Sequence, residues 1–133
     1  LEWIRKTYNP SGTYRLIHTD ARQITRFVPR VDCVATEPYL GPFIKNYPSE
    51  QQAKNIAKEL LPLYQEAIIH LRRISQKNIV FITPRFRTTA RKEVPVNIAP
   101  LLEKNNIPFE GPFLYSSPTS KMLREIWIIK KRL

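Results

Sequence analysis

The chain has little or none of several residue types that small domains use for specialised purposes. It contains 1 cysteine, Cys33, which excludes an internal disulfide and a cysteine cluster for zinc and fits a reducing cytoplasm. Its 3 glycines form no glycine-rich loop, and its 2 histidines, His18 and His70, have no ligand partners at metal spacing. No apolar run approaches the roughly 18 residues that cross a bilayer. We therefore expect a cytoplasmic protein with no bound metal and no membrane partner.

Acidic residues are also scarce. The 133 residues contain 22 lysines and arginines against 11 aspartates and glutamates, a formal net charge of +11. Such an excess favours a polyanionic partner, and nucleic acid first, because each cation that contacts a phosphate releases condensed counterions. A solvated, lysine-rich surface is the alternative. The length fits one domain over residues 1–133, and because the chain begins with Leu1 rather than methionine, we expect it to be part of something longer.

Hydrophobic periodicity predicts an alternation of strands and helices. The order is a helix end at 1–8, strands at 14–18 and 31–36, a helix from Ser49 to Leu71, a strand at 79–82, a helix at 97–104, and an antiparallel pair at 109–116 and 123–130. Ser49 with Gln52 predicts a capping box, and Pro62 predicts a kink or two abutting helices. The apolar stripe of this helix is expected to pack on a sheet, the alternative being a partner helix. The pattern indicates an α/β three-layer domain with an antiparallel edge.

One stretch, 31–45, combines a buried strand with polar chemistry at its end. The β-branched run stops abruptly at Glu37, Pro38 and Tyr39. In an open α/β sheet the carboxyl ends of the strands are where ligands bind, so these three residues are candidates for a site. Cys33 precedes them inside the strand, and we expect a buried core thiol there rather than a nucleophile.

A second stretch, 84–92, interleaves cations with an aromatic residue. We expect it to form a loop suited to phosphates and bases together, the alternative being an ordinary solvated loop. The proline-rich loop after Tyr39 adds one aromatic ring and one lysine. The candidates for nucleic-acid binding are therefore Phe43, Lys45, Arg85, Arg87, Arg91 and Lys92.

Four motifs in order carry a family resemblance. They are His18-Thr19-Asp20-Ala21, Thr36-Glu37-Pro38-Tyr39, the strand from Ile79 to Pro84, and the closing pair with Arg124 to Lys131 as its last strand. Together they resemble the carboxyl-terminal part of a class I S-adenosylmethionine-dependent methyltransferase, nearest to the RNA guanine-N2 methyltransferases that accompany a THUMP RNA-binding domain. The resemblance implies a Rossmann-like sheet that is incomplete here, lacking its first two strands, with a carboxyl-terminal antiparallel strand pair.

The resemblance also implies a reaction and roles for individual residues. The reaction is methyl transfer from S-adenosylmethionine to an exocyclic amino group of a base, with guanine N2 in tRNA or rRNA the first target to expect. Asp20 and Ala21 would hold the cofactor adenine, although Asp20 is also a candidate helix N-cap. The Glu37 carboxylate and the Pro38 carbonyl would accept hydrogen bonds from the amino group. Tyr39, or Phe43, would stack on the flipped base.

Two departures from the family pattern matter. The family tetrapeptide is an Asp, Asn or Ser followed by two prolines and an aromatic, whereas here Tyr39 replaces the second proline and Leu40 takes the aromatic position. The glycine-rich loop and the ribose-binding acid have no counterpart. We therefore expect the isolated chain to bind S-adenosylmethionine poorly. The missing amino-terminal half would belong to the same longer chain or to a separate chain, or else 14–18 would pair directly with 31–36.

Two other functions remain open at this point. One is a basic RNA-binding module without catalysis, in which Arg85, Arg87, Arg91 and Lys92 hold phosphates and Glu37 belongs only to a turn. The other is a DNA amino-methyltransferase, because no segment of the sequence distinguishes DNA from RNA.

Overall fold

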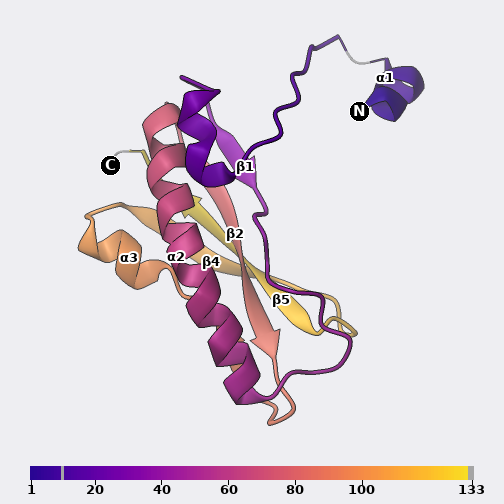
Figure 1. The fold of residues 1–133 in the computed structure, drawn as a ribbon, viewed down its shortest axis with the longest axis vertical. Helices are drawn as coiled ribbons and strands as arrows, with labels where there is room; N and C mark the ends of the chain where they lie inside the picture. Colours follow the sequence, from indigo (N-terminus) through magenta and orange to yellow (C-terminus); the bar gives the residue numbers. More distant parts are fainter. Residues whose placement is uncertain (10, 132–133) are drawn as a thin grey trace.

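The structure is a computed structural model that describes residues 1–9 and 11–131. It is an α/β fold with an open, mixed sheet of five strands (Figure 1). The elements in chain order are α1 (Glu2–Tyr8), the 3-10 helix η1 (Ala21–Arg26), β1 (Val34–Thr36), α2 (Glu50–Ile74), β2 (Ile79–Arg87), β3 (Glu93–Pro95), α3 (Ala99–Lys104), β4 (Phe109–Tyr115) and β5 (Met122–Ile129).

The sheet has the strand order β1-β2-β5-β4, and β3 pairs with the far end of β2. β1 runs parallel to β2, with Val34 opposite Ile79 and Thr36 opposite Phe81. β5 runs antiparallel to both β2 and β4, which confirms the predicted closing pair. Within the described residues β1 has a neighbour on one side only, so its other edge is open.

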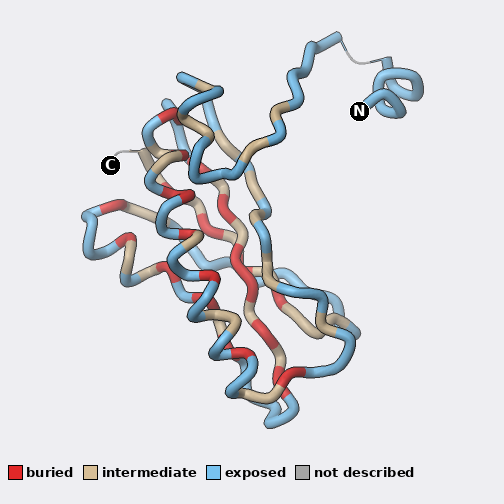
Figure 2. The backbone as a smooth tube through the Cα atoms, in the orientation of Figure 1, coloured by how far each residue is buried: buried red, intermediate tan, exposed pale blue. Residues whose placement is uncertain are grey.

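Helix α2 covers one face of this sheet. Its start is the predicted capping box, in which the Ser49 hydroxyl accepts from the Gln52 backbone N–H and the Gln52 side chain accepts from the Ser49 N–H. The helix continues unbroken through Pro62, so two abutting helices are not present. A stripe at helical spacing turns inward, and its Tyr64 ring meets the edge of Phe81 at 5.5 Å between centroids. Figure 2 shows this buried stripe facing buried positions of the central strands.

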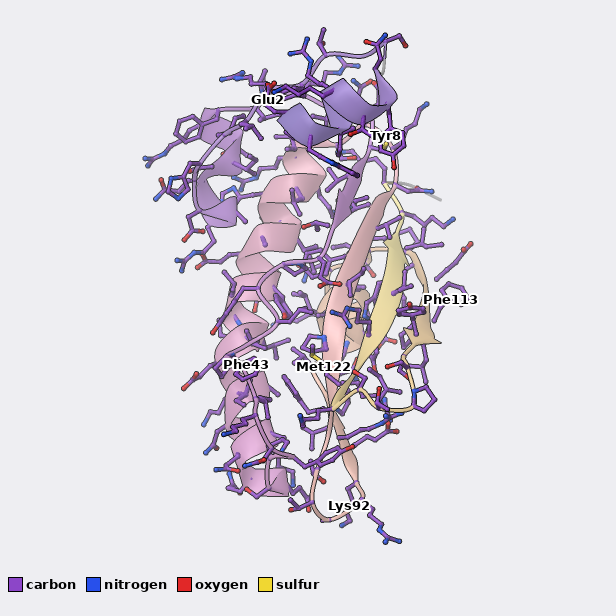
Figure 3. All side chains as sticks on the ribbon, turned by 90° about the vertical axis from the view of Figure 1, so that its right-hand side faces the viewer. Glu2, Tyr8, Phe43, Lys92, Phe113 and Met122 are labelled. Carbon is purple, nitrogen blue, oxygen red and sulfur yellow. The ribbon has the colours of Figure 1, made fainter. Side chains whose placement is uncertain are left out.

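The opposite face of the sheet is apolar and only partly buried. It carries the cross-strand pairs Val80 with Ile128 and Ile82 with Ile126, which alternate with the buried residues beneath α2. Figure 3 shows α2 on one side of the sheet, whereas no helix covers the strands on the side of Phe113. The part of the chain that the structure describes therefore has two layers at the sheet, where three were expected.

The predicted strand at 14–18 is wrong. These residues are extended and mostly exposed, and no ladder pairs them with 31–36. Their contacts are instead with α1, because the Tyr14 hydroxyl donates to Glu2 Oε1 at 2.7 Å and Arg5 lies over the Tyr14 ring. An apolar composition alone does not make a strand, which also needs a neighbouring strand for its N–H and C=O groups.

The strand predicted at 31–36 is shorter than expected. Only 34–36 form a ladder, and Val31 makes an isolated bridge to Ser75. Cys33 precedes the ladder and is exposed, so the expectation of a buried core thiol is wrong. The cause is the open edge of β1, which leaves the residue before the strand uncovered.

Strand β2 is longer than expected, and the loop predicted at 84–92 is wrong in its first half. β2 continues through Pro84 to Arg87, and only 88–92 form the turn into β3. Pro84 lacks an N–H, yet it is tolerated because it lies beyond the end of β1 and just where β3 begins. Its carbonyl still accepts from the Val96 N–H at 3.1 Å.

Candidate functional site

The acidic residue at the carboxyl end of β1 is paired with an arginine from β5. Arg124 Nε donates to Glu37 Oε2 at 2.7 Å, and its second nitrogen lies 3.4 Å from Oε1. Arg124 is opposite Pro84 in the ladder, so its side chain reaches across β2 to the residue that follows β1. The hydrogen bond to Glu37 raises the pKa of the Arg124 guanidinium. Both side chains remain partly exposed, so the pair is accessible to a ligand.

A hydrogen bond from α2 holds the backbone at Tyr39. The buried Tyr64 hydroxyl donates to the Tyr39 carbonyl at 2.7 Å, and burial raises the pKa of Tyr64, which keeps the hydroxyl protonated as a donor. The Tyr39 ring itself is 60% exposed. The backbone of this turn is therefore fixed while its aromatic ring is free to meet a ligand.

A groove of about 380 Å³ opens beside this turn. Its walls are the loop 40–44 and the turn 119–122, with Phe86 and Arg124 between them. Gly41 has φ +102°, and a Cβ there would lie 3.1 Å from Ile56 Cγ2, so a glycine suits this close approach of loop and helix. Figure 3 shows Phe43 and Met122 on opposite walls. The volume is at the lower end of the range of about 300–1,000 Å³ for small-molecule pockets and suits a single base.

Asp20 is the N-cap of η1, which was the alternative to its cofactor role. Its Oδ1 accepts from the Arg22 N–H at 2.8 Å and from Nε at 3.0 Å, and its Oδ2 accepts from Arg22 at 2.7 Å. These bonds lower the pKa of the carboxyl to about 2. No described hydrogen bond or ion pair joins Asp20 or Ala21 to Glu37.

The residues in the described part of the chain do not fit the main cradle of S-adenosylmethionine. Both Asp20 oxygens accept hydrogen bonds from Arg22, so the structure shows this carboxylate as the cap of η1. Gly12, Gly41 and Gly111 lie in three separate segments, so no glycine-rich loop is formed. What the described residues do form is a groove with the Glu37–Arg124 pair beside it.

Two of the predicted nucleic-acid-binding arginines are engaged inside the protein. Arg85 lies 3.0 Å from Glu125, whose side chain is 2% exposed, and 3.4 Å from Glu93. Arg87 donates to the carbonyls of the turn 117–120, the shortest contact being 2.7 Å to Ser120. These guanidiniums therefore fasten β5 and its preceding turn to β2.

The other predicted cations are at the surface. Lys45 is exposed on the loop after β1, and no described hydrogen bond or ion pair engages the Arg91 side chain. Lys92 Nζ is 4.0 Å from Glu50. Arg91 and Lys92 line a hollow of about 540 Å³ together with Tyr47 and the turn 88–89.

The sequence did not indicate Arg124, Tyr64 or Tyr47 as parts of a site. Arg124 is 87 residues from Glu37 and Tyr64 is 25 residues from Tyr39, so no local motif links them. Tyr47 had a usable signal, since it lies in the same loop as Phe43 and Lys45.

Comparison with known proteins adds no family, because no family model and no curated protein matches the chain. Among residues 1–9 and 11–131 there is no cluster of three or more histidine, cysteine, aspartate or glutamate side chains placed to hold a metal ion. Within the same residues no helix has the length and apolar character of a membrane span.

Proposed function

We propose that this chain is the base-binding, carboxyl-terminal catalytic portion of an S-adenosylmethionine-dependent RNA methyltransferase. Its substrate is an exocyclic amino group, with guanine N2 in tRNA or rRNA the first target to test. The observation that carries the proposal is the Glu37 carboxylate, held by Arg124 at the carboxyl end of β1 beside a groove of base size. The net charge of +11 supports a nucleic-acid substrate.

The chemistry assigned to the turn is stabilisation of charge on nitrogen. The lone pair of an exocyclic amine is delocalised into the ring, so the nitrogen becomes positive as it gains a fourth substituent. The Glu37 carboxylate and the Pro38 carbonyl accept the amino hydrogens and bind this charged state more tightly than the neutral amine. The exposed Tyr39 ring supplies a face on which the extruded base stacks.

Arg124 assists by orienting Glu37. Its planar fork directs the carboxylate along one line, while each carboxylate oxygen retains acceptor capacity for the amine. The cradle of the methyl donor lies outside the described residues. The open edge of β1 is consistent with further strands joining the sheet at that point, in the same chain or from a separate one.

A basic RNA-binding module without catalysis is the second candidate. The observation that favours it is the poor fit of the described residues to S-adenosylmethionine. A DNA amino-methyltransferase shares the same groove chemistry, so the substrate must be tested with both nucleic acids.

The proposal is tested by methyl incorporation. The chain, together with the segment proposed to complete its sheet at β1, is incubated with S-adenosylmethionine carrying a labelled methyl group and with RNA or DNA. We expect label in RNA, and we expect Glu37→Ala to lower the rate by about 100-fold, the scale of removing one preorganised partner from a transition state. The matched control is Glu103→Ala, an exposed acid on α3, which should leave the rate unchanged. A well-folded complex without incorporation, or a Glu37→Ala variant at full rate, would contradict it.

A further inference from the structure

We propose that the loop 40–48 is a track for single-stranded RNA, which runs from the groove at Arg124 to the turn that carries Arg91 and Lys92. The proposal deepens the function above, because it names how the RNA beside the target base is held. It rests on that function only for the identity of the polymer, since the features that form the track are independent of catalysis.

The first observation is that three hollows adjoin along this loop. The groove beside Arg124 and a second hollow, of about 510 Å³, share Phe43 and Ile44. The second hollow and the one beside Arg91 share Tyr47. A ligand larger than one nucleotide can therefore pass from one hollow to the next without leaving the surface of the loop.

The second observation is the placement of aromatic rings where the hollows meet. Phe43 is 93% exposed and Tyr47 is 44% exposed, although apolar rings of this size are ordinarily more covered. Each ring stands at a junction, Phe43 between the first and second hollows and Tyr47 between the second and third. Rings spaced along a groove bind successive bases by stacking, whatever the base.

The third observation is the distribution of charge along the track. Lys121 and Arg124 line its first hollow, and Arg91 and Lys92 line its last, with Lys92 at the tip of the turn in Figure 3. Lys45 lies on the loop between them. Cations at both ends and rings in the middle suit an extended sugar-phosphate backbone.

Each acid near the track lies beside a cation, although Arg85 is shared between Glu93 and Glu125. Glu37 pairs with Arg124 at 2.7 Å, and Glu93 lies 3.4 Å from Arg85. Glu50 lies 3.0 Å from Lys54, which leaves little negative charge facing Lys92. The local balance is therefore favourable for phosphates.

The track is fixed before any ligand binds. Thr89 N–H donates to the Pro48 carbonyl at 2.9 Å, and this bond ties the Arg91 turn to the end of the loop. Within the turn the Thr88 hydroxyl donates to the Lys92 carbonyl at 2.7 Å. At the start of the loop, the Tyr64 hydroxyl donates a hydrogen bond to the Tyr39 carbonyl. A preorganised loop loses less entropy on binding.

The occupant is single-stranded because stacking on Phe43 and Tyr47 needs exposed base faces, which a duplex hides. The test uses fluorescence anisotropy of a labelled single-stranded RNA of about 10 nucleotides, within the range of known single-strand sites. We expect Phe43→Ala and Tyr47→Ala each to weaken binding by about 5-fold to 100-fold. The matched control is Tyr8→Ala, an exposed ring on α1 that lines none of the three hollows and should bind like the wild type.

The cations are tested by salt dependence. Replacing Arg91 and Lys92 together by alanine should reduce the slope of log affinity against log salt by about 1.4, because each single-strand phosphate contact contributes about 0.7. Lys104→Ala, on α3 away from the loop, should leave the slope unchanged. All these side chains are exposed, so thermal melting of each variant is expected to match that of the wild type.

Three results would overturn the track. The first is wild-type affinity for the RNA in the Phe43→Ala and Tyr47→Ala variants, and the second is equal affinity for the same RNA annealed to its complement. The third is complete displacement of the RNA by adenosine monophosphate at concentrations near the affinity of the protein for that single nucleotide. Methyl incorporation separates this failure from failure of the proposed function. If the wild type incorporates the methyl label but the Phe43→Ala and Tyr47→Ala variants bind RNA normally, the track alone is refuted. If those variants lose RNA binding as expected but no label is incorporated, the methyltransferase proposal alone is refuted.

Discussion

Arg124 and Glu125 are adjacent in the sequence and serve opposite faces of β5. Arg124 points to the partly exposed side and holds Glu37, while Glu125 is buried on the other side against Arg85. The alternation of a strand thus places one ion pair with both partners partly exposed and one whose carboxylate is buried. The first suits recognition, whereas the second fastens β5 to β2.

Glu125 should make stability depend on pH. Burial is the largest influence on this carboxyl and raises its pKa above the ordinary value of 4.5, even though the hydrogen bond from Arg85 acts in the opposite direction. Between the ordinary and the raised pKa the folded state binds more protons than the unfolded state. The free energy of unfolding therefore falls as the pH rises through this window.

The measurement is urea unfolding of the wild type and of Glu125→Gln at several pH values from 4 upward, roughly the start of the window set by an ordinary glutamate pKa. The difference between the two proteins isolates Glu125, and it should move in favour of the variant as the pH rises. Glu103→Gln, an exposed acid, is the matched control. A difference that is constant with pH, or that moves in favour of the wild type, would contradict this interpretation.

Helix α2 is the element that local sequence predicts best. Its capping box and its apolar stripe are both encoded within a few residues, and both are present. The strand at 14–18 was predicted on the same kind of local pattern and is absent, because a strand depends on a partner that the local pattern does not contain. The prediction ended β2 before Pro84. A proline is tolerated inside this strand only because of where β1 and β3 end, which the local sequence does not show.

The residues of the candidate site also fall into those that the local sequence indicates and those that only the fold brings close. Glu37, Pro38 and Tyr39 were singled out because they follow a strand directly, and the structure pairs Glu37 with Arg124, which lines a groove. Their role as a site stays a prediction. Arg124 could not be predicted, since its proximity to Glu37 is created by the strand order β1-β2-β5. Arg85 was expected to face nucleic acid as part of a loop, but it lies on a strand and pairs with Glu125.

The cap of α2 gives a prediction at the scale of this element. Ser49→Ala removes an acceptor from the Gln52 N–H and should lower the free energy of unfolding by about 1 kcal/mol. Because the Ser49 region also leads out of the loop 40–48, the variant should loosen that loop as well. Urea unfolding measures the change, with Ser11→Ala, in an exposed segment, as control. An unchanged stability in Ser49→Ala would show that the cap adds nothing here.

The molecule as a whole is asymmetric in its two sheet faces and its two sheet edges. α2 covers one face, while the Val80 and Ile126 side is partly open and the outer edge of β1 has no described neighbour. The proposed base site stands at the carboxyl end of that open strand, and the proposed RNA track leads away from it along the loop. Under the proposed function, the residues that hold the methyl donor would join the sheet at this open edge.

The identity of the modified nucleoside tests the central claim most directly. RNA is incubated with S-adenosylmethionine carrying a labelled methyl group, with the chain and with the segment proposed to complete its sheet at β1. The RNA is then digested to nucleosides and analysed by mass spectrometry. The account predicts label on an exocyclic base nitrogen, with N2-methylguanosine the first product to seek, and its loss in Glu37→Ala. Label on a ribose oxygen or a ring carbon, or label that persists in Glu37→Ala, would contradict it.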